Sequence, residues 1–164
     1  MTETLPATEA APWPRALVEL YDAERVQLLR AAYLVCGSTA MAEDAVHDAL
    51  VRVSTRWDSA ERPRSYLYVA VVNAARDASR HARRTQRLGR TRTHDVNPAE
   101  LSLQSMALRD ALARLPERQR VAVVLRFFAD WDDEEIAREI GVRIATVRSL
   151  VHRGVARLRE EWKR

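Results

Sequence analysis

Apolar residues recur at helical spacing along most of the chain, and this pattern predicts an all-α protein. Few glycines (4) and prolines (6) interrupt the pattern, and long stretches rich in arginine, alanine, leucine and glutamate favour helix. The predicted helices cover about residues 15–36, 40–57, 65–84, 101–114, 117–129, 133–140 and 144–161.

Breaks in this periodicity divide the chain into four segments. Residues 1–14 contain three prolines and are predicted to form a disordered N-terminal tail. Residues 15–84 form a first helical module, and residues 102–164 form a second one. Residues 85–101 have no periodicity and are predicted to be a flexible basic linker. We therefore expect two small helical modules joined by a flexible linker.

The second module contains the spacing of a helix-turn-helix. Asp132 is a plausible N-cap with Glu135 three residues later, and Gly141 stands where a left-handed C-cap is needed. Ala137, Gly141 and Val147 supply a small residue, a turn glycine and a branched apolar residue. This combination allows two short helices to cross closely at a steep angle.

The exposed face of the last predicted helix favours binding in a DNA major groove. The side chains on this face are small at the start of the helix, and further along they are basic or able to form hydrogen bonds. An αα-hairpin that is packed only for stability is the alternative. The candidate contact residues are Ala145, Arg148, Ser149, His152, Arg153 and Arg159.

The third predicted helix carries a second basic surface. Arg76, Arg80 and Arg83 fall on the side opposite its apolar stripe. Residues 76–92 contain seven arginines and only one acid, Asp77. A face that is merely solvated usually mixes both signs of charge, so the pattern favours nucleic-acid contact.

Composition narrows the classes of function. The net charge of +4 and a pI of about 9.8 point to an anionic partner. Cys36 is the single cysteine, which suits a reducing compartment, and we expect a buried, inert thiol. The first fifteen residues do not form a signal peptide, and no apolar run reaches the length of a membrane span. We therefore expect a cytoplasmic, nucleoid-associated protein with no membrane partner.

The same sequence offers no basis for catalysis. Its four histidines are scattered, and no phosphate-binding loop or nucleophile motif is present. The run of four acids from Asp132 to Glu135 is better explained by the N-terminus of a helix than by a metal site. We expect no enzymatic activity, no catalytic residues, no cofactor and no metal.

Three segments together resemble the extracytoplasmic-function (ECF) sigma factors of bacterial RNA polymerase. Region 4 of that family is similar to LPERQR followed by VAVVLRFFADWDDEEIAREIGVRIATVRSLVHRGVARLRE. Region 2.2 resembles MAEDAVHDALVRVSTRW, and regions 2.3 and 2.4 resemble PRSYLYVAVVNAARDASRHARR. The resemblance covers about residues 17–84 and 102–162.

The resemblance implies the partners of the chain and their sites. Core RNA polymerase would be bound through its β′ clamp helices and β flap. Promoter DNA would be bound as duplex at the minus-thirty-five element, and as single strand at the minus-ten element once that element is melted. An anti-sigma factor is a further candidate partner.

The family's functional positions can be matched one by one. Tyr66 departs from the pattern, since a tryptophan is common there, and Gly154 stands where alanine is frequent. The polymerase-binding matches are Glu43, Asp44, Val46, His47, Asp48 and Val51. The minus-ten matches are Ser59, Arg62, Arg64, Tyr66, Tyr68, Asn73, Arg76, Arg80, Arg83 and Arg84. The minus-thirty-five matches are Arg143, Ala145, Thr146, Arg148, Ser149, His152 and Arg153.

Two other classes of function remain as alternatives. A helix-turn-helix transcriptional regulator would bind duplex operator DNA by itself, without replacing a sigma factor. A helical protein-interaction module would only sequester a partner, and it would have no use for two arginine faces. Binding to duplex DNA without polymerase distinguishes the regulator from a sigma factor.

Overall fold

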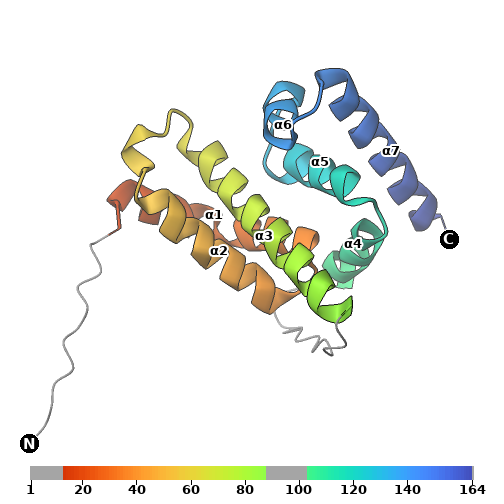
Figure 1. Cartoon of the computed structure of the whole chain (residues 1–164), viewed down its shortest axis with the longest axis horizontal. Coiled ribbons are helices and arrows are strands. Elements are labelled where there is room, and N and C mark those ends of the chain that lie inside the picture. Colours follow the sequence, from red (N-terminus) through yellow and green to blue (C-terminus); the bar gives the residue numbers. More distant parts are fainter. Residues whose placement is uncertain (1–12, 88–102, 164) are drawn as a thin grey trace, which may run out of the picture.

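The computed structural model of the chain describes residues 13–87 and 103–163, and every regular element in these two ranges is a helix (Figure 1). This confirms the predicted all-α class. Residues 1–12 of the predicted tail and 88–101 of the predicted linker lie outside the described ranges. The elements are α1 (Arg15–Cys36), α2 (Thr39–Ser54), the 3₁₀ helix η1 (Trp57–Ser59), α3 (Pro63–Arg87), α4 (Leu103–Ala113), α5 (Glu117–Phe128), α6 (Asp133–Ile140) and α7 (Ile144–Trp162).

In the first module, α1, α2 and α3 all pack against one another (Figure 1). Gly37 ends α1 in a left-handed conformation with φ 79°. Thr39 is predicted to cap the next helix, but Ser38 takes that position. The extended backbone of Ser38 lets its hydroxyl accept a hydrogen bond from the backbone N–H of Met41.

Helix α3 is longer than predicted at both ends. It begins at Pro63, whose fixed φ and missing N–H suit the first turn of a helix. It continues to Arg87, so residues 85–87 of the predicted linker are helical. Leu67, Val71 and Ala74 on the predicted apolar stripe are buried, as expected.

The second module is built around the predicted helix-turn-helix. Asp132 and Glu135 form both hydrogen bonds of a capping box at the start of α6. Gly141 ends α6 with φ 67°. Helix α7 packs on α5 and α6, and Val147 is fully buried between the elements, so the predicted crossing of two short helices is confirmed.

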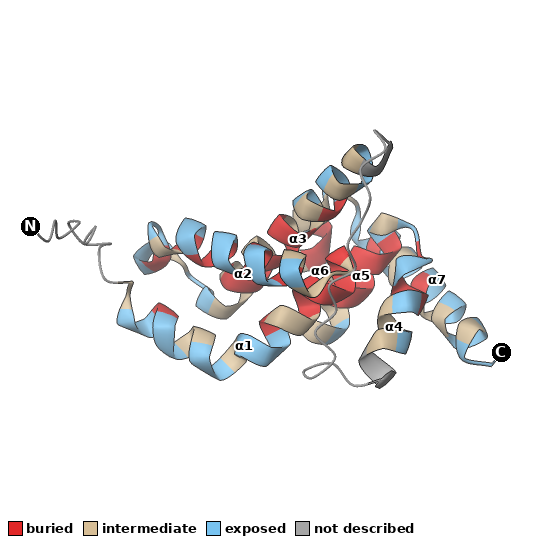
Figure 2. Ribbon diagram, turned by 90° about the horizontal axis from the view of Figure 1, so that it is seen from below, coloured by how far each residue is buried: buried red, intermediate tan, exposed pale blue. Residues whose placement is uncertain are grey.

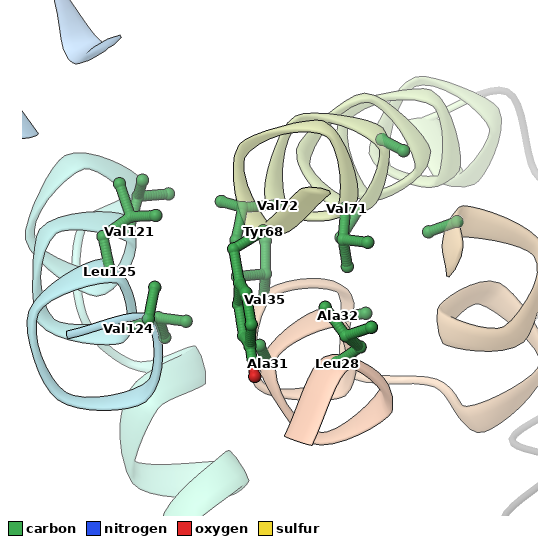
Figure 3. Packing of buried hydrophobic residues seen from close by; sticks show 14 of the residues in the cluster. Leu28, Ala31, Ala32, Val35, Tyr68, Val71, Val72, Val121, Val124 and Leu125 are labelled. Atoms are coloured by element: carbon green, nitrogen blue, oxygen red, sulfur yellow. The ribbon is translucent and has the colours of Figure 1, made fainter. Parts of the chain in front are cut away.

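The two modules pack directly against each other, which the sequence did not predict. Helix α1 contacts α4 and α5. In Figure 3, Val121, Val124 and Leu125 of α5 face Tyr68 and Val72 of α3. These side chains are all buried and belong to one hydrophobic cluster that extends through both modules (Figure 2). The packing of the two modules against each other therefore removes apolar surface of both from water.

Candidate polymerase and nucleic-acid interfaces

Helix α7 presents the predicted minus-thirty-five residues to solvent. All seven are exposed, from Arg143 at the N-cap to Arg153, while Val147 and Gly154 on the opposite side are buried. Arg148 is positioned by α6, because its Nε lies 2.9 Å from Oδ2 of Asp133. The arrangement offers a basic and hydrogen-bonding helix face of the kind that enters a major groove.

Gly154 is explained by the close approach of α7 to α5. A Cβ atom at this position would lie 2.8 Å from Cγ2 of Val123, closer than such contacts allow. The departure from the family's frequent alanine therefore has a steric cause. It fixes how α7, and with it the exposed basic face, sits on the module.

The predicted polymerase face on α2 is largely accessible. Glu43, Asp44, His47 and Asp48 are exposed, and Val51 keeps 47% of its surface in contact with solvent. Val46 is the exception. It is only 2% exposed because it faces the core of the first module, so it supports the helix and cannot contact a partner in this arrangement.

Trp13 adjoins this face, although the sequence predicts it to lie in the disordered tail. The ring centroids of Trp13 and His47 are 6.4 Å apart. A single aromatic residue in a proline-rich segment gave no periodic pattern from which this contact could be predicted.

The arginines of α3 converge on a single carboxylate of the second module. Oε1 of Glu117 lies 2.7 Å from Nη2 of Arg80 and 3.4 Å from Nε of Arg76. Oε2 of the same residue lies 4.0 Å from Nη1 of Arg83. Burial acts to raise the pKa of Glu117, but the hydrogen bond and charge of Arg80 and the charge of Arg76 outweigh it, so the pKa is below the ordinary value. Arg84, the next candidate along the helix, is exposed.

The loop before α3 leads into a second polar cluster. Arg64 binds Glu24 of α1 with two nitrogens, at 3.0 and 3.3 Å, and its guanidinium lies 4.8 Å from the ring centroid of Tyr68. The hydrogen bond from Arg64 lowers the pKa of Glu24 more than burial raises it. Arg62 pairs with Glu135 of α6, and Ser59 is exposed.

The two tyrosines predicted for the minus-ten element are placed differently. Tyr66 is half-buried and keeps part of its ring accessible. Tyr68 has no exposed surface, and its hydroxyl donates a hydrogen bond to Oε2 of Glu24 at 2.7 Å. Burial, followed by the bond to Glu24, raises the pKa of Tyr68. Tyr68 therefore has no ring face available to a base in this structure, and here it holds Glu24 in place.

The partners of these basic residues could not have been found from the sequence. Asn73 donates a hydrogen bond to Glu139, and Glu117 and Glu135 bind arginines of the first module. Each acid lies more than 30 residues from its partner, so no helical spacing connects the two. In the sequence, these glutamates are indistinguishable from ordinary residues of the first turn of a helix or of its solvent-facing side.

Cys36 has the environment that the sequence analysis expected. The thiol is buried at the end of α1 and donates a hydrogen bond to the carbonyl oxygen of Ser38 at 3.4 Å. Burial raises its pKa to about 11, so the thiol stays protonated at neutral pH.

The described part of the chain contains neither a cluster of possible metal ligands nor a helix able to span a membrane. Across residues 13–87 and 103–163, histidine, cysteine and acidic side chains do not gather in groups of three or more that could hold an ion. Within the same ranges, no helix is both long and apolar enough to cross a bilayer.

Comparison with known proteins assigns each module to a family. Residues 20–85 match the family "Sigma-70 region 2", and residues 105–158 match "Sigma-70, region 4". The two matches fall on the modules built by α1–α3 and α4–α7.

Whole-chain relatives agree with this assignment. The RNA polymerase sigma-E factor of Streptomyces avermitilis is 34% identical over 140 residues, which span 82% of this chain and 78% of that protein. The ECF RNA polymerase sigma factor SigM of Mycobacterium tuberculosis is also 34% identical, over 87% of this chain and 75% of that protein. Among solved structures, the sigma factor RpoE in complex with the anti-sigma factor NepR from Bartonella quintana superposes with a TM-score of 0.69 at 25% identity, covering 91% of this chain and 95% of that one. The chain therefore belongs to the extracytoplasmic-function sigma factors, which act with RNA polymerase in transcription initiation.

Proposed function

We propose that this sigma factor recognises the minus-thirty-five element as duplex with α7, and the minus-ten element with α3 and the loop before it, and that minus-ten recognition melts the DNA. The observation that carries the proposal is the division of exposed charge. One basic surface lies on α3 of the first module and another on α7 of the second, and the exposed face of α2 is acidic.

The proposed contact of α7 is supported by the exposure and chemistry of its side chains. Arg148 and Arg153 can address guanine edges or phosphates, and Ser149 and His152 can bond to bases or to the backbone. Because Arg148 forms an ion pair with Asp133, DNA must compete with that carboxylate for the guanidinium. The neighbouring small residue Ala145 allows the start of the helix to approach base pairs closely.

For the minus-ten element we propose separate roles for the loop and the helix. The segment from Ser59 to Arg64, which runs from the end of η1 into the first turn of α3, would hold an unstacked base, and Tyr66 offers a partly accessible ring for stacking. Arg76, Arg80 and Arg83 of α3 would bind the phosphates of the melted strand. Extruding a base costs a few kcal/mol of unstacking, which contacts to that base must offset.

Polymerase docking is proposed for α2. Asp44 and Asp48 lie on the same exposed face one helical turn apart, together with His47 and Val51. An acidic face with an apolar residue beside it fits a basic helical partner such as the β′ clamp helices, while the second module would contact the β flap. We place this activity in the cytoplasm at the nucleoid, and an anti-sigma factor is a proposed regulator. Sigma factors are not a class of enzymes, and we propose no catalytic activity for this chain.

The experiment that tests this function measures binding to core polymerase. We expect the chain to coelute with purified bacterial core polymerase and Asp44→Lys/Asp48→Lys to lose that binding. The matched control is Glu134→Lys/Glu160→Lys, which makes the same charge change at exposed positions of the second module. Tight binding of the free chain to duplex promoter DNA, without any association with core polymerase, would instead establish a helix-turn-helix regulator.

A further inference from the structure

Six of the ten side chains predicted for the minus-ten element form a hydrogen bond or an ion pair with the second module. Arg76, Arg80 and Arg83 surround Glu117 at the start of α5. A carboxylate enclosed by several guanidinium groups occupies them as a phosphate would, since both anions accept the same charge-assisted hydrogen bonds.

The same pattern repeats along α6 and the segment before it. Asn73 donates to Glu139, and Arg62 pairs with Glu135. Nη1 of Arg64 donates to the backbone carbonyl oxygen of Ala129, at 3.3 Å. The second module thus presents acceptor groups to the basic and polar side chains of the first module at several separate points.

We propose that the second module is an intramolecular competitor for minus-ten DNA, with Glu117 taking the place of a DNA phosphate on α3. The proposal rests on the proposed function, in which these arginines bind the melted strand. In the closed state Glu117 already occupies these arginines, although Arg80 and Arg83 remain partly exposed, so DNA must displace the carboxylate to bind them fully.

Opposing contributions act on the closed state. Burial of Tyr68, Val72 and Leu125 favours the contact between α3 and α5 (Figure 3). Arg120 of α5 opposes it. This residue is only 4% exposed, and among the described residues its Nε and Nη2 find no hydrogen-bond acceptor. Burial lowers the pKa of Arg120, because removing a charged guanidinium group from water is unfavourable, and opening the interface would let water reach this group.

The proposed polymerase face remains free in the closed state. Helices α1 and α3 lie between α2 and the second module, as Figures 1 and 3 show. Asp44 and Asp48 are exposed there. Polymerase can therefore dock on the closed protein while Glu117 occupies the arginines of α3, so that full contact of α3 with the promoter follows opening.

The test compares Glu117→Gln with Glu134→Gln in the full chain. Each substitution removes one negative charge from the first turn of a helix in the second module, but only Glu117 lies against α3. Separation of the modules is followed by fluorescence energy transfer between dyes on cysteines introduced at the exposed positions Arg52 and Arg157. The native Cys36 is buried and is not labelled.

DNA binding is followed in the same variants by fluorescence anisotropy with a labelled single-stranded oligothymidylate. We expect Glu117→Gln to lower the transfer efficiency and to tighten binding about fivefold, the effect of losing one partly exposed ionic cluster. Glu134→Gln should behave as the parent does. Arg80→Gln should weaken binding in both the parent and the Glu117→Gln chain.

The outcomes separate this proposal from the function it rests on. If Arg80→Gln weakens binding but Glu117→Gln changes neither transfer nor affinity, the competitor proposal is overturned and the DNA role of α3 stands. If Arg80→Gln has no effect on binding, the proposed DNA role of α3 fails, whatever the modules do. Equal tightening by Glu117→Gln and Glu134→Gln would also overturn the proposal, since the effect would then come from net charge alone.

Discussion

Replacing Tyr68 by phenylalanine tests the polar cluster that positions Arg64. The tyrosine hydroxyl donates a 2.7 Å hydrogen bond to Glu24, and the same carboxylate receives two bonds from Arg64. Tyr68 is completely buried, so the substitution removes one hydroxyl group and leaves the packed ring in place. The change therefore isolates one hydrogen bond to a charged acceptor.

The size of the effect follows from this geometry. A hydrogen bond to an ionised group contributes about 1.5–3 kcal/mol, and we expect a loss of about 2 kcal/mol in the free energy of unfolding. With a urea dependence of about 2–3 kcal/mol per M for a protein of this size, that loss lowers the urea midpoint by roughly 0.7–1 M.

The assay is urea unfolding at neutral pH, followed by circular dichroism at a helical wavelength. Tyr66→Phe is the matched control, because Tyr66 lies on the same helix and is only half-buried. A midpoint shift for Tyr68→Phe no larger than that of Tyr66→Phe would refute the reasoning. In a Glu24→Gln background, the effect of Tyr68→Phe should shrink, because the acceptor no longer carries a charge.

Three further predictions concern α7 and the contact between the modules. Gly154→Ala should lower the free energy of unfolding by about 1 kcal/mol, because crowding against Val123 exceeds the gain in helix propensity; an unchanged or higher urea midpoint would contradict this. Arg148→Ala should reduce discrimination between promoter variants by about 1–3 kcal/mol in the initiation complex, whereas equal losses on every sequence would make Arg148 a phosphate contact. Acid should open the modules. The pKa of Glu117 is lowered in the closed state, so its ionised carboxylate stabilises closure fully at a pH above the ordinary pKa of 4.5, and this stabilisation is lost as the pH falls through the lowered pKa. Energy transfer between the modules should therefore fall with pH, and a chain carrying Glu117→Gln that shows the same acid response would exclude Glu117 as the cause.

Local rules explain why the helix-turn-helix could be predicted in detail. The capping box of Asp132 and Glu135, the left-handed Gly141 and the buried Val147 each follow from residues a few positions apart. The faces of α7 follow from its 3.6-residue period in the same way. The misplaced cap at Ser38 shows the limit of such rules, since two adjacent residues with hydroxyl groups can compete for one position.

Contacts between the modules could not be predicted, because they join residues that are distant in the sequence. The arginines of α3 were correctly identified as a basic face, but nothing nearby in the sequence named Glu117 as their partner. Tyr68 was predicted to meet DNA because of its place in a motif, and only the structure shows that its ring is buried and its hydroxyl bonded to Glu24 of α1. The alternation of polar and apolar residues identifies which face of a helix is buried, but it does not show which other element covers that face.

The most direct test of the central claim is run-off transcription with core RNA polymerase on a library of genomic promoters from the source organism, with and without the chain. We expect promoter-specific transcripts that appear only with the chain and disappear with Asp44→Lys/Asp48→Lys. Transcripts that do not depend on the chain, while the free chain binds duplex DNA tightly, would contradict a role as a sigma factor.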